Sequence, residues 1–421
     1  MELLTLTIPT EAPSAHSWPR VRALASIPPP AAPGLRARWW RPAPGGLLAR
    51  YLFDDADALG AFERSGRAAD AELSGLAGLT GLAGARARRE SVDEATIDTA
   101  FDRPVLVVCA PRTGSTMLAD LLARSRDLWT AEGELQGIID GIPGLDLPSR
   151  GHRSQVLDER DATPAIARTL RACLLAELRD HRGRRRLDLP VPQRPARLRL
   201  LDKTVENALR LPFLLRVFPD AQLVLLWRDL RPNLSSMVEA WGSPGFVSIP
   251  SLPGWPGERW CFVLPEGWRE RAGASPTQLA AFQWRSIHEA ILDALEGLPR
   301  DRWTTARYAD LIADPGATAR RLCRFMDVDA AGCSELAARG PLPPSPTMLS
   351  PPSPIKWRSN RAFDPAVAAS LQPLAGRIRH LAAGAAAPVL RASQPSRTRL
   401  ACFVESLPAE PLPASARVSP S

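Results

Sequence analysis

Hydrophobic and polar residues alternate in a regular order from residue 102 onward. Short apolar runs bounded by polar residues predict buried strands at 103–110, 198–202, 221–227 and 302–308. Apolar residues at helical spacing predict helices at 116–126, 205–217, 232–241, 278–298 and 317–326. Strands that alternate with helices are typical of a doubly wound α/β domain, in which helices flank a parallel sheet.

The segments on either side of this pattern are less regular. Residues 1–50 are rich in Pro, Ala and Arg without clear periodicity, which predicts an irregular or loosely packed segment. Residues 52–100 are predicted to be helical in part, from the Leu and Ala spacing at 72–88 and from Ser91 and Glu94, which match a capping box.

These patterns predict three parts of the chain. We expect a partly helical N-terminal appendage over 1–100 and an α/β domain over 101–360. A weak helical pattern at 363–383 and a polar segment from about residue 391 predict a C-terminal helix and a disordered tail within 361–421.

Residues 242–275 interrupt the α/β pattern with many Gly and Pro and several Trp and Phe residues. A long irregular insertion in a compact domain is usually functional, which predicts a lid or binding loop. A satellite hydrophobic cluster that pins the loop is an equally good interpretation.

Composition excludes several classes of protein. The six cysteines form no C-x-x-C pair, so the sequence signals neither a disulfide framework nor a zinc site, and a reducing cytoplasm fits best. No stretch approaches the roughly 18 apolar residues of a membrane span. The net charge is +8, but the basic residues are spread along the chain and the densest cluster, Arg182–Arg186, carries no interleaved aromatics, which disfavours nucleic-acid binding.

The basic residues are almost all arginine. Lys and Arg total 53, and lysine occurs at Lys203 and Lys356, which leaves 51 arginines. Because arginine serves wherever a basic group only solvates a surface, the two lysines are candidates for sites that need a compact ammonium charge.

The segment "CAPRTGSTML" (109–118) lies where a predicted strand turns into a helix. Free N–H groups and the helix dipole favour an anion at such a turn. The loop lacks the lysine of the G-x-x-x-x-G-K-[ST] motif, however, because Ser115 and Thr116 follow Gly114 directly.

Five segments in order resemble the sulfotransferases that use 3′-phosphoadenosine 5′-phosphosulfate (PAPS), in particular the branch that includes protein-tyrosine sulfotransferases and bacterial relatives. They are "APRTGST" (110–116), "AEGEL" (131–135), the stretch 201–237 that begins "LDKT" and contains "WRDLRPNLSSM", "RYADLIADP" (307–315) and "IKW" (355–357). The resemblance implies the sulfotransferase fold, with PAPS as co-substrate, PAP as product and no required metal.

The resemblance also implies which residues bind the donor. The loop that would hold the 5′-phosphosulfate corresponds to Arg112, Thr113, Gly114, Ser115 and Thr116, with Arg112 as the cation. Arg228 and Ser236 correspond to the 3′-phosphate site, and Tyr308 corresponds to a tyrosine near the adenine.

For catalysis, the resemblance implies Glu134 as general base and Lys203 and Lys356 as cations near the transferring group. Lys356 would also contact the donor. Glu132 or a histidine could assist Glu134, and Thr347 or Ser350 could add a hydroxyl near the nucleotide. The five histidines are too dispersed in sequence to signal a metal site.

The sequence departs from the family pattern at two positions. Val205 replaces the proline after K-[TS], and Ala309 replaces a glutamate after the tyrosine. These departures affect loop rigidity and local packing, not the proposed chemistry.

We therefore expect a sulfotransferase that acts on a hydroxyl of a small or lipid-like alcohol or phenol, favoured by the aromatic insertion. Protein-tyrosine sulfation is an alternative, although Gln136 stands where those enzymes place an arginine. A non-catalytic PAP-binding protein is a second rival, and a P-loop kinase is a third and less favoured one. Neither a nucleic-acid partner nor a membrane span is expected.

Overall fold

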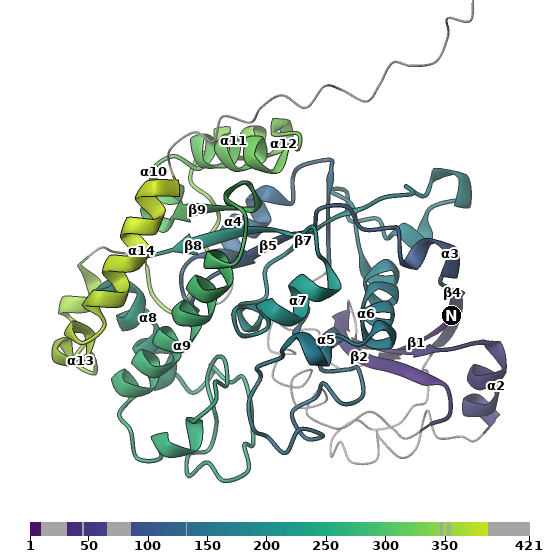
Figure 1. The fold of residues 1–421 in the computed structure, drawn as a ribbon, viewed down its shortest axis with the longest axis horizontal. Helices are drawn as coiled ribbons and strands as arrows, with labels where there is room; N and C mark the ends of the chain where they lie inside the picture. The colour runs from purple at the N-terminus through teal and green to yellow at the C-terminus, as the bar shows by residue number, and fades with distance from the viewer. Residues whose placement is uncertain are drawn as a thin grey trace, which may run out of the picture. The chain divides into compact units, whose positions relative to one another are not determined.

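A five-stranded parallel sheet forms the centre of the fold (Figure 1). Its strands are β5 (Val105–Val108), β6 (Leu128–Thr130), β7 (Arg199–Asp202), β8 (Gln222–Trp227) and β9 (Trp303–Arg307). Their order across the sheet is β6-β7-β5-β8-β9, with every neighbouring pair parallel. The predicted α/β class is confirmed.

The computed structural model describes residues 1–9, 32–43, 46–64, 86–131, 133–345, 348–351, 353 and 355–385. Contacts among the residues of Met1–Ala387 make one unit. The second unit, Pro388–Ser421, lies outside the described residues, and so does the predicted disordered tail.

Helices cover both faces of the parallel sheet (Figure 1). The longer helices are α4 (Ser115–Leu122), α6 (Pro164–Glu177), α7 (Leu211–Val217), α8 (Leu230–Gly242), α9 (Pro276–Glu296), α11 (Pro315–Met326), α12 (Ala331–Ala338) and α14 (Gln372–Ala385). Shorter helices are α2 (Ala56–Arg64), α3 (Glu94–Ile97), α5 (Gln136–Ile139), α10 (Tyr308–Ala313) and α13 (Pro365–Ala369). Single 3₁₀ turns occur at Glu159–Asp161, Arg186–Asp188, Val191–Gln193, Val205–Leu209, Trp268–Arg271, Arg300–Arg302 and Lys356–Arg358.

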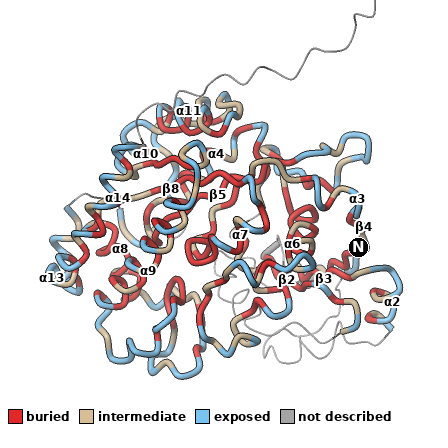
Figure 2. The backbone as a smooth tube through the Cα atoms, viewed as in Figure 1, coloured by how far each residue is buried: buried red, intermediate tan, exposed pale blue. Residues whose placement is uncertain are grey.

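Strand β5 shows why the sheet is apolar throughout. Val105 and Val107 face a core that contains α4, α11 and α12, whereas Leu106 and Val108 face the core that contains α6 to α9. Because both faces are covered, every residue of β5 is buried, and the strands of the central sheet are mostly buried (Figure 2). This burial explains the short continuous apolar runs in the sequence.

The predicted helix at 205–217 is divided in the structure. Residues Val205–Leu209 form a 3₁₀ turn, and α7 begins only at Leu211. Pro212 lies in the first turn of α7, where its missing N–H costs nothing but would interrupt a helix that continued through it.

Residues near the N-terminus form an antiparallel sheet, so the expectation of an irregular segment was wrong for them. Its strands, in the order β2-β3-β1-β4, are β1 (Glu2–Pro9), β2 (Leu35–Ala43), β3 (Gly46–Phe53) and β4 (Arg86–Ser91). One face packs on α2, and the other carries Leu3, Trp39 and Leu52 into the core of the α/β domain. Because both faces are covered, the strands lack the apolar and polar alternation that would have predicted them.

The predicted capping box also differs from the structure. Ser91 ends β4 and donates a hydrogen bond from its hydroxyl to Glu2, at 2.8 Å. Asp93 caps α3 instead, accepting the N–H of Ala95 at 3.1 Å. Of the apolar spacing at 72–88, residues 72–85 lie outside the described residues and the remainder belongs to β4.

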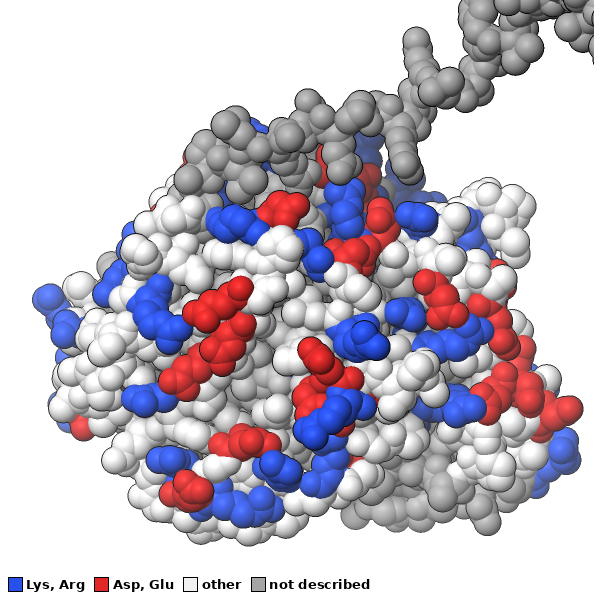
Figure 3. Space-filling view, viewed as in Figure 1, with Lys and Arg blue, Asp and Glu red and all other residues white. Residues whose placement is uncertain are grey.

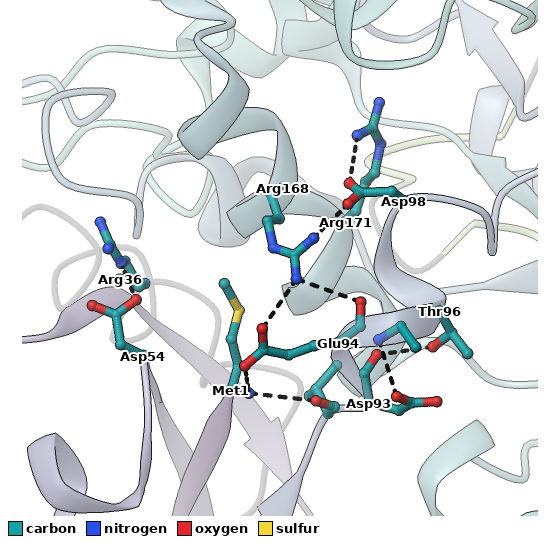
Figure 4. Close-up of polar contacts among 11 residues, drawn as sticks. Met1, Arg36, Asp54, Asp93, Glu94, Thr96, Asp98, Arg168 and Arg171 are labelled. Carbon is teal, nitrogen blue, oxygen red and sulfur yellow. Dashed lines mark hydrogen bonds and ion pairs between the residues drawn. The ribbon is translucent and has the colours of Figure 1, made fainter.

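Ion pairs and hydrogen bonds join the N-terminal elements to α6 (Figure 4). Arg168 of α6 donates to Glu94 of α3 at 3.1 Å and also to Asp98, while the amino group of Met1 pairs with Glu94 at 3.0 Å. The backbone of Gly141, which follows α5, packs closely against β2. A Cβ at Gly141 would lie 1.9 Å from the carbonyl oxygen of Arg38.

A buried carboxylate lies at this junction. Glu177, the last residue of α6, has no exposed surface and accepts the indole N–H of Trp39 at 2.8 Å. It forms ion pairs with Arg41, at 2.9 Å, and with Arg50. Burial, together with the nearby positive charges of Arg185 and Arg41, lowers the pKa of Arg50 to about 9. Glu177 is therefore the counter-charge that allows arginines of β2 and β3 to be buried.

Among the described residues, no helix has the length and apolar character needed to cross a membrane.

We predict that Glu177→Gln lowers the free energy of unfolding by about 3–5 kcal/mol, because it leaves buried guanidinium groups without their counter-charge. Equilibrium urea denaturation followed by circular dichroism measures this change. Glu335→Gln is the control, since Glu335 and its partner Arg339 are both exposed, and it should cost less than about 1 kcal/mol. Equal losses in the two variants would contradict the role given to Glu177.

Candidate functional site

The carboxyl ends of the five parallel strands bring the sequence-predicted residues together. Lys203, Arg228 and Tyr308 are the first residues after β7, β8 and β9. The loop with Arg112 follows β5, and Glu134 follows β6. Since ligands bind at this edge of open parallel sheets, the topology alone makes it the candidate site.

A cavity lies at this edge. Among its lining residues are all but one of the predicted site residues, namely Arg112, Gly114, Ser115, Thr116, Glu134, Lys203, Arg228, Ser236, Tyr308 and Lys356. The exception is Thr113, whose buried hydroxyl donates to the carbonyl oxygen of Ala110 at 2.7 Å. The side chain of Thr113 therefore helps to fix the conformation of the loop between β5 and α4.

The loop between β5 and α4 has an unusual backbone. Arg112 and Gly114 both have positive φ angles, of 66° and 90°. A Cβ on Gly114 would lie 2.6 Å from the ring of Tyr308, so a larger residue would collide with that ring. The amide of Asn233 donates to Pro111 O at 2.9 Å, and a guanidinium N–H of Arg228 donates to Arg112 O at 3.0 Å. These contacts hold the N-terminus of α4 open toward the cavity, as an anion requires.

Two arginines and a tyrosine form one end of the cavity. The guanidinium of Arg228 stacks 4.4 Å from the centre of the Tyr308 ring. Arg112 donates from Nε to the hydroxyl of Ser236 at 3.4 Å. Burial lowers the pKa of both arginines from their usual value. An arginine retains its positive charge after such a shift, so this end is suited to a phosphate group.

A carboxylate and an ammonium group meet at the other end. Nζ of Lys203 lies 2.5 Å from Oε1 of Glu134, and both side chains are largely buried. Burial alone would lower the pKa of Lys203, but the charge of Glu134 and its hydrogen bond raise it above the usual value. The pair thus places a proton acceptor beside an ammonium group whose positive charge the pair stabilises.

Lys356 reaches the same cavity from the C-terminal part of the chain. Its ammonium group lies 2.5 Å from Oε2 of Glu239 in α8 and also contacts the hydroxyl of Ser350. That hydroxyl donates to Oε1 of Glu239 at 2.6 Å. Desolvation acts to raise the pKa of Glu239, but the hydrogen bonds from Lys356 and Ser350 lower it overall.

Sequence reasoning missed two carboxylates at the site. Glu206 lines the cavity, and Glu239 holds Lys356 beside it. Neither belongs to a recognisable motif, and only the position of Glu239 three residues after Ser236 could have suggested it, as helical neighbours. Of the possible assisting residues, Ser350 lines the cavity, whereas Thr347 and Glu132 lie outside the described residues.

The residues of the aromatic insertion are divided between a buried cluster and the lining of the cavity. Trp255, Trp260 and Trp268 of the insertion pack edge to face against one another in the hydrophobic core. Phe246 and Phe262 instead line the cavity, with ring centres 4.9 Å apart. Phe262 has a φ of 62°, a conformation that a bulky residue rarely adopts outside functional or strained sites. Its N–H donates to the hydroxyl of Ser248 at 2.7 Å, which holds it there.

Histidine is absent from the cavity lining formed by the described residues. His288 is buried beside Trp284, and burial lowers its pKa to about 4. In the described part of the chain, no group of three His, Cys, Asp or Glu residues is arranged to hold a metal ion. Basic and acidic side chains are interspersed over the face in Figure 3.

The chain matches a known protein family over part of its length. The model of the sulfotransferase family matches residues 104–251. A search of curated proteins found no match.

Several solved structures are similar in part. The sulfotransferase domain from the curacin biosynthetic pathway is 18% identical, with a TM-score of 0.37, over 68% of this chain and 99% of that chain. Sulfotransferase STF9 from Mycobacterium avium is 16% identical, with a TM-score of 0.42, over 68% of this chain and 78% of that chain. Mouse sulfotransferase SULT7A1, complexed with PAP, is 12% identical, with a TM-score of 0.35, over 66% and 86%.

The matched segment contains the loop at Arg112, the Glu134–Lys203 pair, and Arg228 with Ser236. The model of the sulfotransferase family thus matches the part of the chain that carries most of the predicted site, in agreement with the resemblance seen in the sequence.

Proposed function

We propose that the protein transfers the sulfuryl group of PAPS to a hydroxyl group of a small or lipid-like alcohol or phenol. One observation carries the proposal: the Glu134–Lys203 pair and the Arg228–Tyr308 pair line the same cavity, on either side of the loop at Arg112. Transfer of a sulfuryl group from a nucleotide with two phosphate positions requires a proton acceptor, a loop that binds the 5′-phosphosulfate and a second cationic site.

The donor is assigned from the charged groups. The loop at Arg112 and the free N–H groups of α4 would bind the 5′-phosphosulfate, with Lys356 as a further cation. Arg228 and Ser236 would bind the 3′-phosphate, and the ring of Tyr308 would stack near the adenine. The absence of the P-loop lysine after Gly114 disfavours a kinase.

In the proposed reaction, the acceptor hydroxyl gives its proton to Glu134 as its oxygen attacks sulfur. A new O–S bond forms while the bond between sulfur and the 5′-phosphate oxygen breaks. The electron pair of that bond remains on PAP as negative charge. Lys203, Lys356 and Arg112 neutralise the charge that develops on the sulfuryl and phosphate oxygens.

The acceptor end is apolar. Phe246, Phe262 and Val205 line the cavity together with Glu134, so an apolar acceptor can place its hydroxyl at the base. Gln136 donates to Asp140 and occupies the position where protein-tyrosine sulfotransferases are expected to carry an arginine. These features favour a small molecule over a protein tyrosine.

We place the reaction in the cytoplasm. The described cysteines are free thiols, and disulfides are rare in that compartment.

Donor identity is tested by thermal denaturation with PAP, ADP and ATP·Mg. PAP at about 100 times its Kd should stabilise the folded protein by roughly 2.7 kcal/mol. At equal concentration PAP should raise the unfolding temperature more than ADP does, because only PAP carries a 3′-phosphate. Gly114→Ala should remove the response, since its Cβ collides with Tyr308. Gly144→Ala is the matched control, with a φ of 86° and open space around its Cβ. A preference for ATP·Mg would refute the donor assignment.

Glu134→Gln tests the base. The variant should bind PAP as the parent does, while the rate of PAP formation from PAPS and an acceptor falls by roughly 10²–10⁴-fold. Glu296→Gln, an exposed glutamate paired with Arg377, is the control and should retain full activity. Turnover that is unchanged in Glu134→Gln would exclude Glu134 as the base.

The acceptor class is tested with a panel of 2-naphthol, a medium-chain alkanol and a tyrosine peptide. We expect turnover of 2-naphthol or the alkanol, with a KM that rises about tenfold or more in Phe262→Ala, because one buried aromatic contact is lost. The KM for PAPS should not change. Phe325→Ala, which alters α11 on the other face of the sheet, controls for general loss of packing. Turnover of the peptide alone would instead support protein-tyrosine sulfation.

A further inference from the structure

A buried hydrogen-bond chain lies directly behind the Glu134–Lys203 pair. The carboxylate of Asp202, the last residue of β7, accepts hydrogen bonds from the hydroxyl of Thr204, at 2.9 Å, and from the amide of Asn207. The oxygen of Thr204 accepts the backbone N–H of Leu135 at 2.6 Å. All four residues are buried.

The direction of these bonds follows from the chemistry of a hydroxyl group. Thr204 has one hydroxyl proton, which it donates in the hydrogen bond to the carboxylate of Asp202. The lone pairs of the oxygen are then free to accept the N–H of Leu135. Burial raises the pKa of Asp202 to about 7, although the hydrogen bond from Thr204 acts to lower it.

The sequence positions of these residues show which two loops the buried hydrogen bonds connect. Leu135 follows Glu134, and Thr204 follows Lys203. The loop after β6 and the loop after β7 are therefore joined twice, by the ion pair between side chains and by the buried bond one residue further on. The ion pair faces the cavity, where a ligand can disturb it, whereas the second bond does not line the cavity.

We propose that Thr204, held by Asp202, is the positioning residue for the base: it fixes the backbone beside Glu134 against the backbone beside Lys203. The inference rests on the proposed function, because it presumes Glu134 to be the base. Thr204 does not line the cavity, so it acts through Leu135. A displacement of a reacting group by about 1 Å can cost roughly 100-fold in rate, so a single bond at this point has a large effect.

Thr204→Val tests the inference, because valine has nearly the same shape but lacks the hydroxyl. We expect kcat for PAP formation to fall by roughly 10–100-fold, with the KM for PAPS and the Kd for PAP unchanged. Thr204→Ser restores the hydroxyl and should return kcat to within about threefold of the parent. Circular dichroism establishes that each variant is folded at the assay temperature.

Thr277→Val is the matched control. The buried hydroxyl of Thr277 also donates to one group, Ala362 O at 2.8 Å, and accepts another, the N–H of Asp364 at 3.1 Å. It joins α9 to the segment before α13 and does not line the cavity. Its valine variant should lower the unfolding temperature without lowering kcat.

Three results would overturn the inference: parental kcat in Thr204→Val, an equal loss in Thr204→Ser, or an equal loss in Thr277→Val. They are distinguishable from failure of the proposed function, which Glu134→Gln reports separately. If Glu134→Gln is inactive and Thr204→Val is fully active, the base stands and the positioning role fails.

Discussion

The parallel register of the central sheet is the constraint on which the site depends. Because the five strands run in one direction, the chain leaves every strand at the same edge. The strand order β6-β7-β5-β8-β9 therefore sets the order of the site residues along this edge. Glu134 and Lys203 come first, then the loop at Arg112, then Arg228 and Tyr308. Glu134 and Lys203 are neighbours because β6 and β7 are paired, not because they are close in sequence.

The register in turn depends on burial from both sides. The residues of β5 alternate between two helical layers, so a shift of one residue would exchange the two faces. The N-terminal sheet contributes to one of these layers through Trp39 and Leu52. Glu177 fixes the sheet there, because its carboxylate contacts Trp39 and Arg41 of β2 and Arg50 of β3. A sheet that does not line the cavity thus stabilises the layer that supports it.

The sequence was sufficient where a motif or a buried strand was present. The strands β5, β7, β8 and β9 were predicted from apolar runs, and the residues at their ends were predicted from the resemblance. Strand β6 has three residues, too few to show a pattern, and the N-terminal strands are covered on both faces. The spacing of Glu239 from Ser236 was the one hint in the sequence, but its ion pair with Lys356, 117 residues away, could not be predicted from it. The same holds for the bond between Thr204 and Leu135, which only the pairing of β6 with β7 creates.

The composition of the cavity has a consequence for chemical reactivity. Lys203 and Lys356 are the two lysines of the chain, and both line the cavity. Apart from the α-amino group, every primary amine of this protein therefore lies at one place. Acylation of lysine removes its positive charge, whereas the guanidinium groups that make up the rest of the basic surface are not amines. A protein with 53 basic side chains thus has both of its lysine amines in the cavity where the proposed transfer occurs.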